Sequence, residues 1–234
     1  MIDKVQSSYI YGFIEKDSPG KVKLQGTDEL YPMHLKPSST IKKIKIWFGA
    51  PKEKNDIKSI IAIQVKYINY ITGEKKETAI QGSSIDGTDI TTEELEIKEG
   101  DYLSKFNIGF EDYITHIKFS TKKSNSIELG TIIEENEKRS TNEINEKDNI
   151  ILNIKGYYTP NGIRAIGVDY IPFKDFCFIR LMDVFRLRLR LKKNEEEKKK
   201  YTEEAISKLN YEAQCFIKLC LLPDKTFLGV IKYV

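Results

Sequence analysis

Apolar and polar residues alternate with a period of two through most of the chain, over residues 41–171. Ile44 and Ile46 alternate with lysine, and another alternating run extends from Ile61 to Tyr67. Successive side chains of a β-strand point to opposite faces, so this pattern predicts half-buried strands. Turn residues separate the runs at intervals of roughly 8–14 residues, which predicts an all-β sandwich, barrel or prism.

Short polar segments mark the connections between these strands. Thr72, Gly73 and Glu74 predict a hairpin turn, and Gly100 with Asp101 predicts the next turn. Residues 132–149 are highly charged and contain no aromatic side chain. We expect this stretch to be a long, solvated hairpin loop.

After Pro172 the spacing of apolar residues changes to that of a helix. From Thr202 onward one apolar stripe recurs every three to four residues: Ala205, Ile206, Leu209, Ala213, Phe216, Ile217 and Cys220. We predict a helical hairpin or one long interrupted helix, then a short strand at 227–234. Residues 185–191 (FRLRLRL) alternate strictly and suit either a helix or a strand.

The sequence therefore predicts three parts. Residues 1–39 form an N-terminal extension with one or two short strands that pack on the main domain. Residues 40–172 form the β domain, and residues 173–234 form an arginine-rich helical C-terminal extension.

Four segments of the β domain, taken in order, resemble the jacalin-related lectins. They are STIKKIKIWFG with DIKSIIAIQVKY, then ELEIKEGDYL, then ITHIKFSTKKSNSIELG, and last IILNIKGYYTPNGIRAIGVDYIP. The resemblance covers about residues 40–172. It implies a mainly β fold, a jacalin-like β-prism of three antiparallel sheets, to which the C-terminal α-helical extension is added.

The sugar loop of that family is altered in this chain. Members bind sugar through a Gly-x-x-x-Asp loop before an Ala-Ile-Gly strand, and the Asp carboxylate accepts hydrogen bonds from sugar hydroxyls. Pro160 falls on the Gly position and Arg164 on the Asp position. A guanidinium donates but does not accept, and proline lacks the N–H group. The resemblance therefore implies that the usual sugar contacts are not retained.

A carbohydrate site elsewhere on the prism stays open as an alternative. The candidate carbohydrate-binding residues at this loop are Asn161, Gly162 and Arg164. The aromatic-containing turns near Tyr70 and Tyr157 are further candidates.

Positive and negative charges nearly balance over the whole chain, but the C-terminal extension is its basic part. The chain has 38 Lys and Arg against 35 Asp and Glu, a net charge of +3, which is too mild to indicate a nucleic-acid partner. Four of the six arginines lie close together: Arg180, Arg186, Arg188 and Arg190. Arginine offers a forked set of donors that lysine lacks. These residues either bind a partner or pair within the chain. The partner would be an acidic protein surface, an anionic lipid headgroup or RNA, and RNA is the least favoured because the neighbouring residues are aliphatic rather than aromatic.

Residues for metal or covalent chemistry are scarce. His34 and His116 are the only histidines, and no Cys or His spacing fits zinc. Residues 86–89 (DGTD) fit a hairpin turn better than a calcium loop. The three cysteines lie in apolar sequence and are expected to be reduced core thiols: Cys177, Cys215 and Cys220. We expect no enzyme, no metal and no cofactor.

The chain begins without a basic and then apolar leader, and no stretch approaches the ~20 apolar residues that cross a bilayer. We expect a cytoplasmic protein without a transmembrane segment. The favoured hypothesis is a non-enzymatic structural subunit of a large assembly, with a cytoskeletal or ciliary setting suggested by analogy, in which the prism is a scaffold for other protein subunits. One alternative is a cytosolic carbohydrate-binding lectin whose partners are glycans. Another is a peripheral membrane protein that uses the Arg/Leu run.

Overall fold

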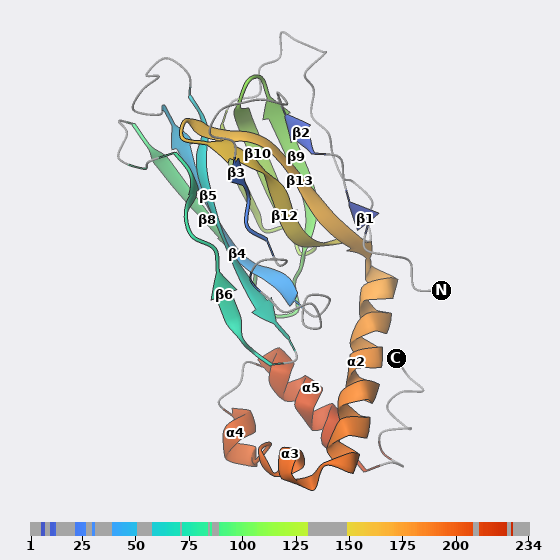
Figure 1. Cartoon of the computed structure of the whole chain (residues 1–234). Helices are drawn as coiled ribbons and strands as arrows, with labels where there is room; N and C mark the ends of the chain where they lie inside the picture. Colours follow the sequence, from blue (N-terminus) through green and yellow to red (C-terminus); the bar gives the residue numbers. More distant parts are fainter. Residues whose placement is uncertain are drawn as a thin grey trace.

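The computed structural model describes residues 6–7, 10–12, 22–26, 30, 39–50, 58–70, 72–83, 85, 89–130, 149–207, 211–223 and 226. Three β-sheets make up the body of the molecule, and the helices gather at one end of it (Figure 1). His34, residues 86–88, residues 132–148 of the expected hairpin loop and the strand expected at 227–234 lie outside the described residues, and Asn149, expected to end that loop, begins a strand.

All described strand pairs are antiparallel. Sheet A has the order β1 (Gln6–Ser7), β13 (Gly162–Pro172), β12 (Asn149–Thr159) and β3 (Val22–Lys23), and β2 (Tyr11–Gly12) also pairs with β13. Sheet B has the order β6 (Lys75–Glu77), β5 (Ser59–Asn69), β4 (Ser39–Gly49) and β8 (Thr91–Glu96), and β7 (Gln81–Gly82) pairs with β5. Sheet C has the order β11 (Ser126–Gly130), β10 (Ile114–Thr121) and β9 (Leu103–Phe110).

The inner faces of the three sheets enclose one large apolar core. Ile44 and Ile46 on β4 are buried there with Val65 on β5, which is the alternation that the sequence shows. Phe106 and Phe119 stack in the same core with ring centroids 5.1 Å apart. The predicted mainly β fold, with three antiparallel sheets and C-terminal helices, is therefore confirmed. The period-two pattern predicted it because such a pattern places one face of each strand in the core.

The first 39 residues contribute to sheet A. Strand β1 pairs with β13 near Tyr170, β2 pairs with β13 at Ala165, and β3 pairs with β12 at Tyr157. Sheet A is thus built from the beginning of the chain and from residues just before the helices. The division at residues 39 and 172 stays a prediction.

The helical extension begins where the last strand ends. Helix α2 (Phe173–Lys193) follows β13 directly, and α3 (Glu195–Lys199), α4 (Glu203–Ser207) and α5 (Tyr211–Leu221) come after it. Residues 185–191 lie within α2 and form a helix, not a strand. Helix α5 turns back onto α2, where the Cys220 thiol lies 3.7 Å from the Val184 carbonyl oxygen. The tail is therefore a helical hairpin.

A second apolar core lies between these helices and the prism. Ile206, Ile217 and Cys220 of the predicted stripe are buried in it together with Ile150 and Ile171 of sheet A. The three thiols differ in their surroundings, since Cys220 is buried, Cys177 is half-buried and Cys215 is exposed. The expectation of three core cysteines is wrong for Cys215, which α5 turns toward solvent.

None of the described helices has the length and apolar character needed to cross a membrane.

Candidate functional site

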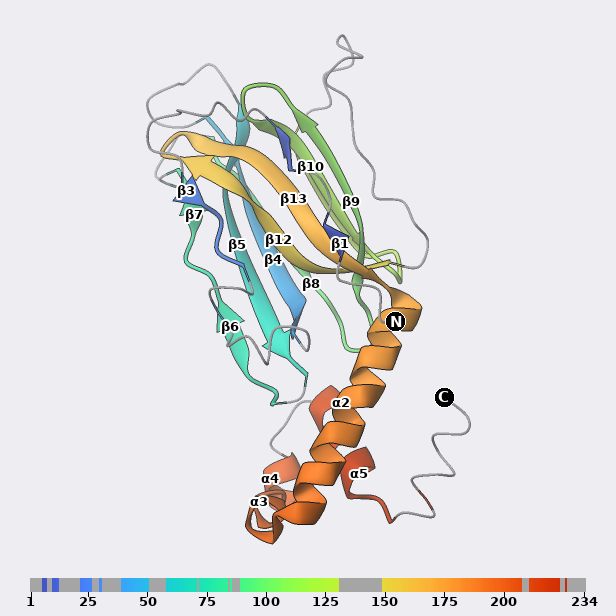
Figure 2. The ribbon, with the colours of Figure 1, turned by 45° about the vertical axis from the view of Figure 1, so that its right-hand side comes forward.

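The prism has two ends that differ in what lies on them. We call the end with the turns at 111–113 and 160–161 the open end. The end with the turns at 70–74, 98–102 and 122–125 faces α2, and we call it the covered end. The helices gather at the covered end, and the β12–β13 turn lies at the opposite end of the body (Figures 1 and 2).

The sequence-predicted residues of the sugar loop come together at the open end. Thr159 pairs with Gly162 across a turn formed by Pro160 and Asn161, and the Asn161 N–H donates to Thr159 Oγ1 over 3.4 Å. Gly162 has a φ of 136°, and a methyl group there would lie 3.1 Å from the carbonyl oxygen of Ile60. The positive φ, together with this close approach to β5, favours glycine at this position.

Arg164 joins this hairpin to the neighbouring turn of sheet C. Its Nη1 donates to the carbonyl oxygen of Asp112 over 2.9 Å, and its guanidinium lies 4.6 Å from the centroid of the buried Tyr113 ring. The guanidinium is thereby held in place at the open end. Its chemistry is that of a cationic hydrogen-bond donor, so it suits ligand oxygens that accept hydrogen bonds. Carbohydrate binding by Asn161, Gly162 and Arg164 stays a prediction.

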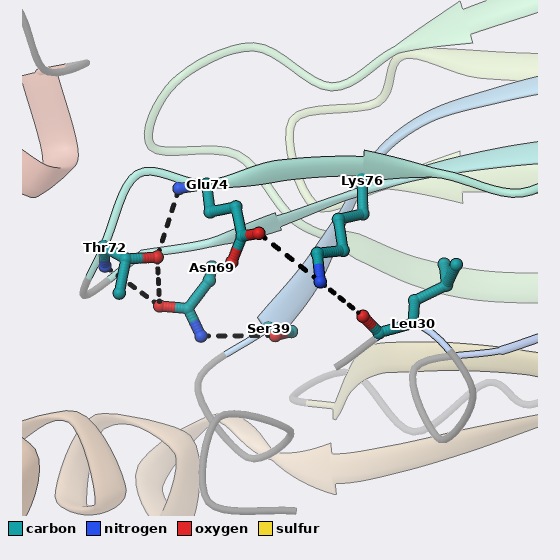
Figure 3. A network of polar contacts seen from close by, with 6 residues as sticks. All are labelled: Leu30, Ser39, Asn69, Thr72, Glu74 and Lys76. Atoms are coloured by element: carbon teal, nitrogen blue, oxygen red, sulfur yellow. Dashed lines mark hydrogen bonds and ion pairs between the residues drawn. The ribbon is translucent and has the colours of Figure 1, made fainter. Parts of the chain in front are cut away.

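At the covered end, a network of polar contacts holds the β5–β6 turn (Figure 3). Asn69 is buried, and its Oδ1 accepts hydrogen bonds from the N–H (3.0 Å) and hydroxyl (3.3 Å) of Thr72. Its Nδ2 donates to Ser39 Oγ over 3.4 Å. Lys76 Nζ donates to the carbonyl oxygen of Leu30 over 2.8 Å. The predicted turn at residues 72–74 is therefore present, and the network holds it in shape next to Tyr70.

The neighbouring Tyr70 contacts α2 rather than lining an open surface. Its hydroxyl donates to Asp183 Oδ2 over 3.1 Å, and Arg180 lies 4.3 Å from its ring centroid. Arg180 Nη1 also donates to the Tyr102 hydroxyl over 2.7 Å. Phe176 meets both tyrosine rings edge-on, at centroid distances of 6.0 and 5.3 Å. These contacts fix α2 to the prism, and the structure does not support the Tyr70 turn as a sugar site.

The four clustered arginines divide into two pairs. Arg180 makes the contacts just described, and Arg188 is only 6% exposed and donates to the Cys220 carbonyl oxygen over 2.9 Å. That carbonyl belongs to the last turn of α5, where backbone acceptors lack helical partners. The Arg186 side chain is 71% exposed and lies 3.3 Å from Asp183, and Arg190 is exposed in the last turn of α2.

Of the two interpretations that the sequence left open, intrachain pairing therefore describes Arg180 and Arg188. Partner binding stays a prediction, and Arg186 with Arg190 are the members placed to make it. The position of each arginine around the helix explains the difference. Positions 180 and 188 lie on the same face as the buried Val184, whereas positions 186 and 190 lie on another face.

His116 pairs with a carboxylate of the neighbouring strand in sheet C. His116 is buried, with Nε2 at 3.0 Å from Glu128 Oε1. Hydrogen bonds from Lys118 and then His116 hold the pKa of Glu128 below its ordinary value. Among the described residues, no three His, Cys, Asp or Glu side chains lie close enough together to hold a metal ion.

Comparisons with known proteins place the fold. No known family model matches the sequence, and no curated protein matches it. Calsepa lectin, solved in complex with a biantennary N-glycan, is 17% identical with a TM-score of 0.51, covering 74% of this chain and 99% of its own. Malaysian banana lectin is 17% identical with a TM-score of 0.49, covering 72% of this chain and 99% of its own.

A mannose-binding jacalin-related lectin from Ananas comosus is 16% identical with a TM-score of 0.47, covering 72% of this chain and 98% of its own. At these identities the likeness concerns the fold alone. Because it spans almost the whole of Calsepa lectin and agrees with the three sheets described above, this chain has the β-prism fold of the jacalin-related lectins.

Proposed function

We propose that this protein is a non-enzymatic carbohydrate-binding protein whose glycan site lies at the open end of the prism. The observation that carries the proposal is the grouping of Asn161, Gly162 and Arg164 on one hairpin, with Arg164 held over Tyr113. The described helices all lie at the other end. The likeness in fold to Calsepa lectin, which was solved with a glycan, supports this class of function.

The chemistry of the site indicates which sugars suit it. A carboxylate at position 164 would accept hydrogen bonds from sugar hydroxyls, whereas the guanidinium that is present donates them. Charge-assisted hydrogen bonds from arginine to an anionic group are about twice as strong as neutral ones. We therefore propose that the ligand is a glycan with acceptor oxygens at this position, and that a carboxylate- or sulfate-bearing sugar binds more tightly than its neutral analogue.

Titration calorimetry against matched neutral and acidic glycans tests this proposal. Arg164→Ala is expected to weaken binding at least tenfold, and Arg164→Lys is expected to recover only part of the loss because it lacks the planar fork. Arg186→Ala is the matched control, since it removes an exposed arginine at the other end. Absence of binding to every neutral and acidic glycan would remove the proposal.

A second candidate function is favoured by Arg186 and Arg190, which are exposed on α2. Here the protein is a cytoplasmic structural subunit, in a cytoskeletal or ciliary assembly, whose prism is a scaffold and whose α2 contacts other protein subunits. The tagged protein is purified from its native cells and eluted first with sugars and then with high salt. Partners released by sugar support the glycan-binding function, and partners released only by salt support the assembly function.

The double variant Arg186→Glu/Arg190→Glu tests the assembly function directly. Reversing both charges is expected to release the protein from its salt-sensitive partners. Co-purification at the wild-type level would contradict this function. Fluorescence imaging of the tagged chain then determines whether it lies on cytoskeletal or ciliary structures.

A further inference from the structure

The outward face of α2 carries large apolar side chains that solvent reaches. Phe178 and Leu189 are 47% and 59% exposed. Met182 and Phe185 between them are half-buried, and Phe185 also packs in part against the second core. We call these four residues the α2 stripe. Scattered exposed apolar residues are ordinary, but a row of them along one helix indicates an interaction surface.

The spacing of the α2 stripe indicates what kind of surface would cover it. Its members follow one another at intervals of four, three and four residues, the a/d spacing of a heptad. Such a row forms a narrow seam, as in helix–helix packing. A helix that lies in a membrane interface buries a broader apolar face. The spacing therefore favours an α-helix as the occupant.

The charges beside the stripe indicate the polarity of that helix. Arg186, at a heptad e position, has a 71% exposed side chain, and Lys193 is exposed at the next e position. Lys174 is exposed on the other flank, at a g position, and the exposed Lys192 ends the apolar row at the next d position. Asp183 accepts a hydrogen bond from the Tyr70 hydroxyl with Oδ2 and lies 3.3 Å from Arg186 Nη1 through Oδ1, but its side chain is only 11% exposed, so the Arg186 side chain remains largely in solvent. A partner helix with glutamate or aspartate at its e and g positions would complement these cations.

The other described helices of the extension leave most of this face outward. Val184, Leu187 and Leu191 occupy the opposite face of α2 and are buried in the second core. Helix α5 packs on that buried face, as the hydrogen bond from Arg188 to the Cys220 carbonyl oxygen shows. The contacts at the covered end hold α2 rigidly to the prism, so little ordering is needed before a partner docks.

We propose that the α2 stripe docks an acidic amphipathic helix of another protein. The proposal rests on the assembly function, given above as the second candidate, and it specifies the partner's chemistry. It is independent of the glycan site, which lies at the other end of the prism.

Binding of a synthetic helical peptide to the full chain tests this proposal. The probe is a fluorescein-labelled peptide of about three heptads with leucine at a and d and glutamate at e and g, and the matched peptide carries lysine at e and g. Fluorescence anisotropy is expected to show saturable binding of the acidic peptide alone. The double variant Phe178→Ser/Leu189→Ser is expected to bind it at least tenfold more weakly.

A charge exchange sharpens the test. Arg186→Glu is expected to lower the affinity for the acidic peptide severalfold and to raise the affinity for the basic peptide. Lys199→Glu, an equal charge change at an exposed position of α3, is the control and is expected to change neither affinity. Circular dichroism confirms that the variants keep their helices.

Three outcomes would overturn the proposal. The first is equal binding of the acidic and basic peptides. The second is binding of the chain to phosphatidylserine vesicles, lost in Phe178→Ser/Leu189→Ser, without binding of the acidic peptide, which would assign the stripe to a membrane. The third is peptide binding only after removal of residues 227–234, which would assign it to the chain itself. If the peptide does not bind but Arg186→Glu/Arg190→Glu releases native partners, the assembly function stands and only the partner's chemistry is wrong.

Discussion

The two ends of the prism contain the same pair of side chains in different surroundings. Arg180 lies 4.3 Å from the ring centroid of Tyr70 at the covered end, and Arg164 lies 4.6 Å from that of Tyr113 at the open end. Arg180 also donates to the Tyr102 hydroxyl within a shell of aromatic rings, whereas Arg164 contacts the backbone of an exposed turn. An arginine–tyrosine pair thus fixes a helix at one end and presents a cationic donor at the other.

The comparison extends to the two apolar cores. The first core fills the prism, and the second lies between the prism and the helices and has its own set of residues. Because the two sets do not overlap, damage to the helical extension can be separated from damage to the prism. Four measurements test these differences between the two ends and the two cores.

The largest effect is expected from Phe176→Ala. Phe176 is fully buried in the second core against Tyr70 and Tyr102, and truncation of a buried phenylalanine typically lowers the free energy of unfolding by about 3–5 kcal/mol. Denaturant unfolding measures the loss. Phe178→Ala on the exposed side of α2 is the control, with an expected change below about 0.5 kcal/mol. Equal effects of the two substitutions would contradict the packing of α2 described here.

At the open end, Gly162→Ala is expected to lower the free energy of unfolding by about 2–3 kcal/mol. A side chain at a φ of 136° is strained, and the added methyl group would crowd the Ile60 carbonyl oxygen. Thermal unfolding measures the change, and the exposed Pro160→Ala serves as the control in the same turn. If Gly162→Ala left the free energy of unfolding unchanged, the turn would be free to move, and the proposal of a glycan site there would lose support.

A pH-dependent effect of about 2 kcal/mol is expected from Asp101→Asn at the covered end. Burial favours a raised pKa for Asp101, but hydrogen bonds from Thr121, the N–H groups of Lys123 and Tyr102, and Asn125 outweigh it and lower the pKa. The carboxylate therefore stabilises the fold above its unfolded pKa of about 3.9, and this contribution is lost as the pH falls through the lower folded pKa.

Thermal unfolding of the wild type and Asp101→Asn from pH 7 to pH 2 measures this contribution. The difference between them should stay constant down to about pH 5 and then shrink toward zero. The exposed neighbour Glu99→Gln is the control. If the stability difference between the wild type and Asp101→Asn instead grew as the pH fell, the pKa of Asp101 would be raised in the folded state rather than lowered.

The smallest perturbation is thiol labelling, which leaves the sequence unchanged. Burial raises the pKa of the Cys220 thiol to about 12, and burial also raises that of Cys177. Iodoacetamide at pH 8 should therefore modify the exposed Cys215 first and Cys220 last. Mass spectrometry of digested protein measures the order. Phe176→Ala should accelerate labelling of Cys220, and rapid labelling of Cys220 in the wild type would contradict the packing of α5 on α2.

Strands were more predictable from the sequence than helices, as two segments show. Ile44 and Ile46 alternate with lysine in the sequence and are buried on β4, because a strand's period is local and needs no knowledge of its neighbours. Residues 185–191 alternate equally well and yet are helical. Leu187 and Leu191, four apart, are buried in the second core, while Leu189 is exposed, so packing against α5 selected the helix.

The candidate sites divide in the same way. The hairpin of Asn161, Gly162 and Arg164 could be located from the sequence, because the resemblance to the jacalin-related lectins extends through this loop. Its contacts with Tyr113 and Ile60 could not, because they come from other sheets.

The period-two strands and the change to helices after Pro172 could be predicted from the sequence, because each depends on residues that are close along the chain, whereas the β-prism was implied by the resemblance to the jacalin-related lectins. Which arginines pair within the chain and which face outward became clear from the folded structure alone. Arg180 meets Tyr102 across 78 positions of sequence, and Arg188 meets Cys220 across 32. Such contacts depend on the rotation of α2 about its axis and on the packing of the prism against it, and no local pattern specifies either.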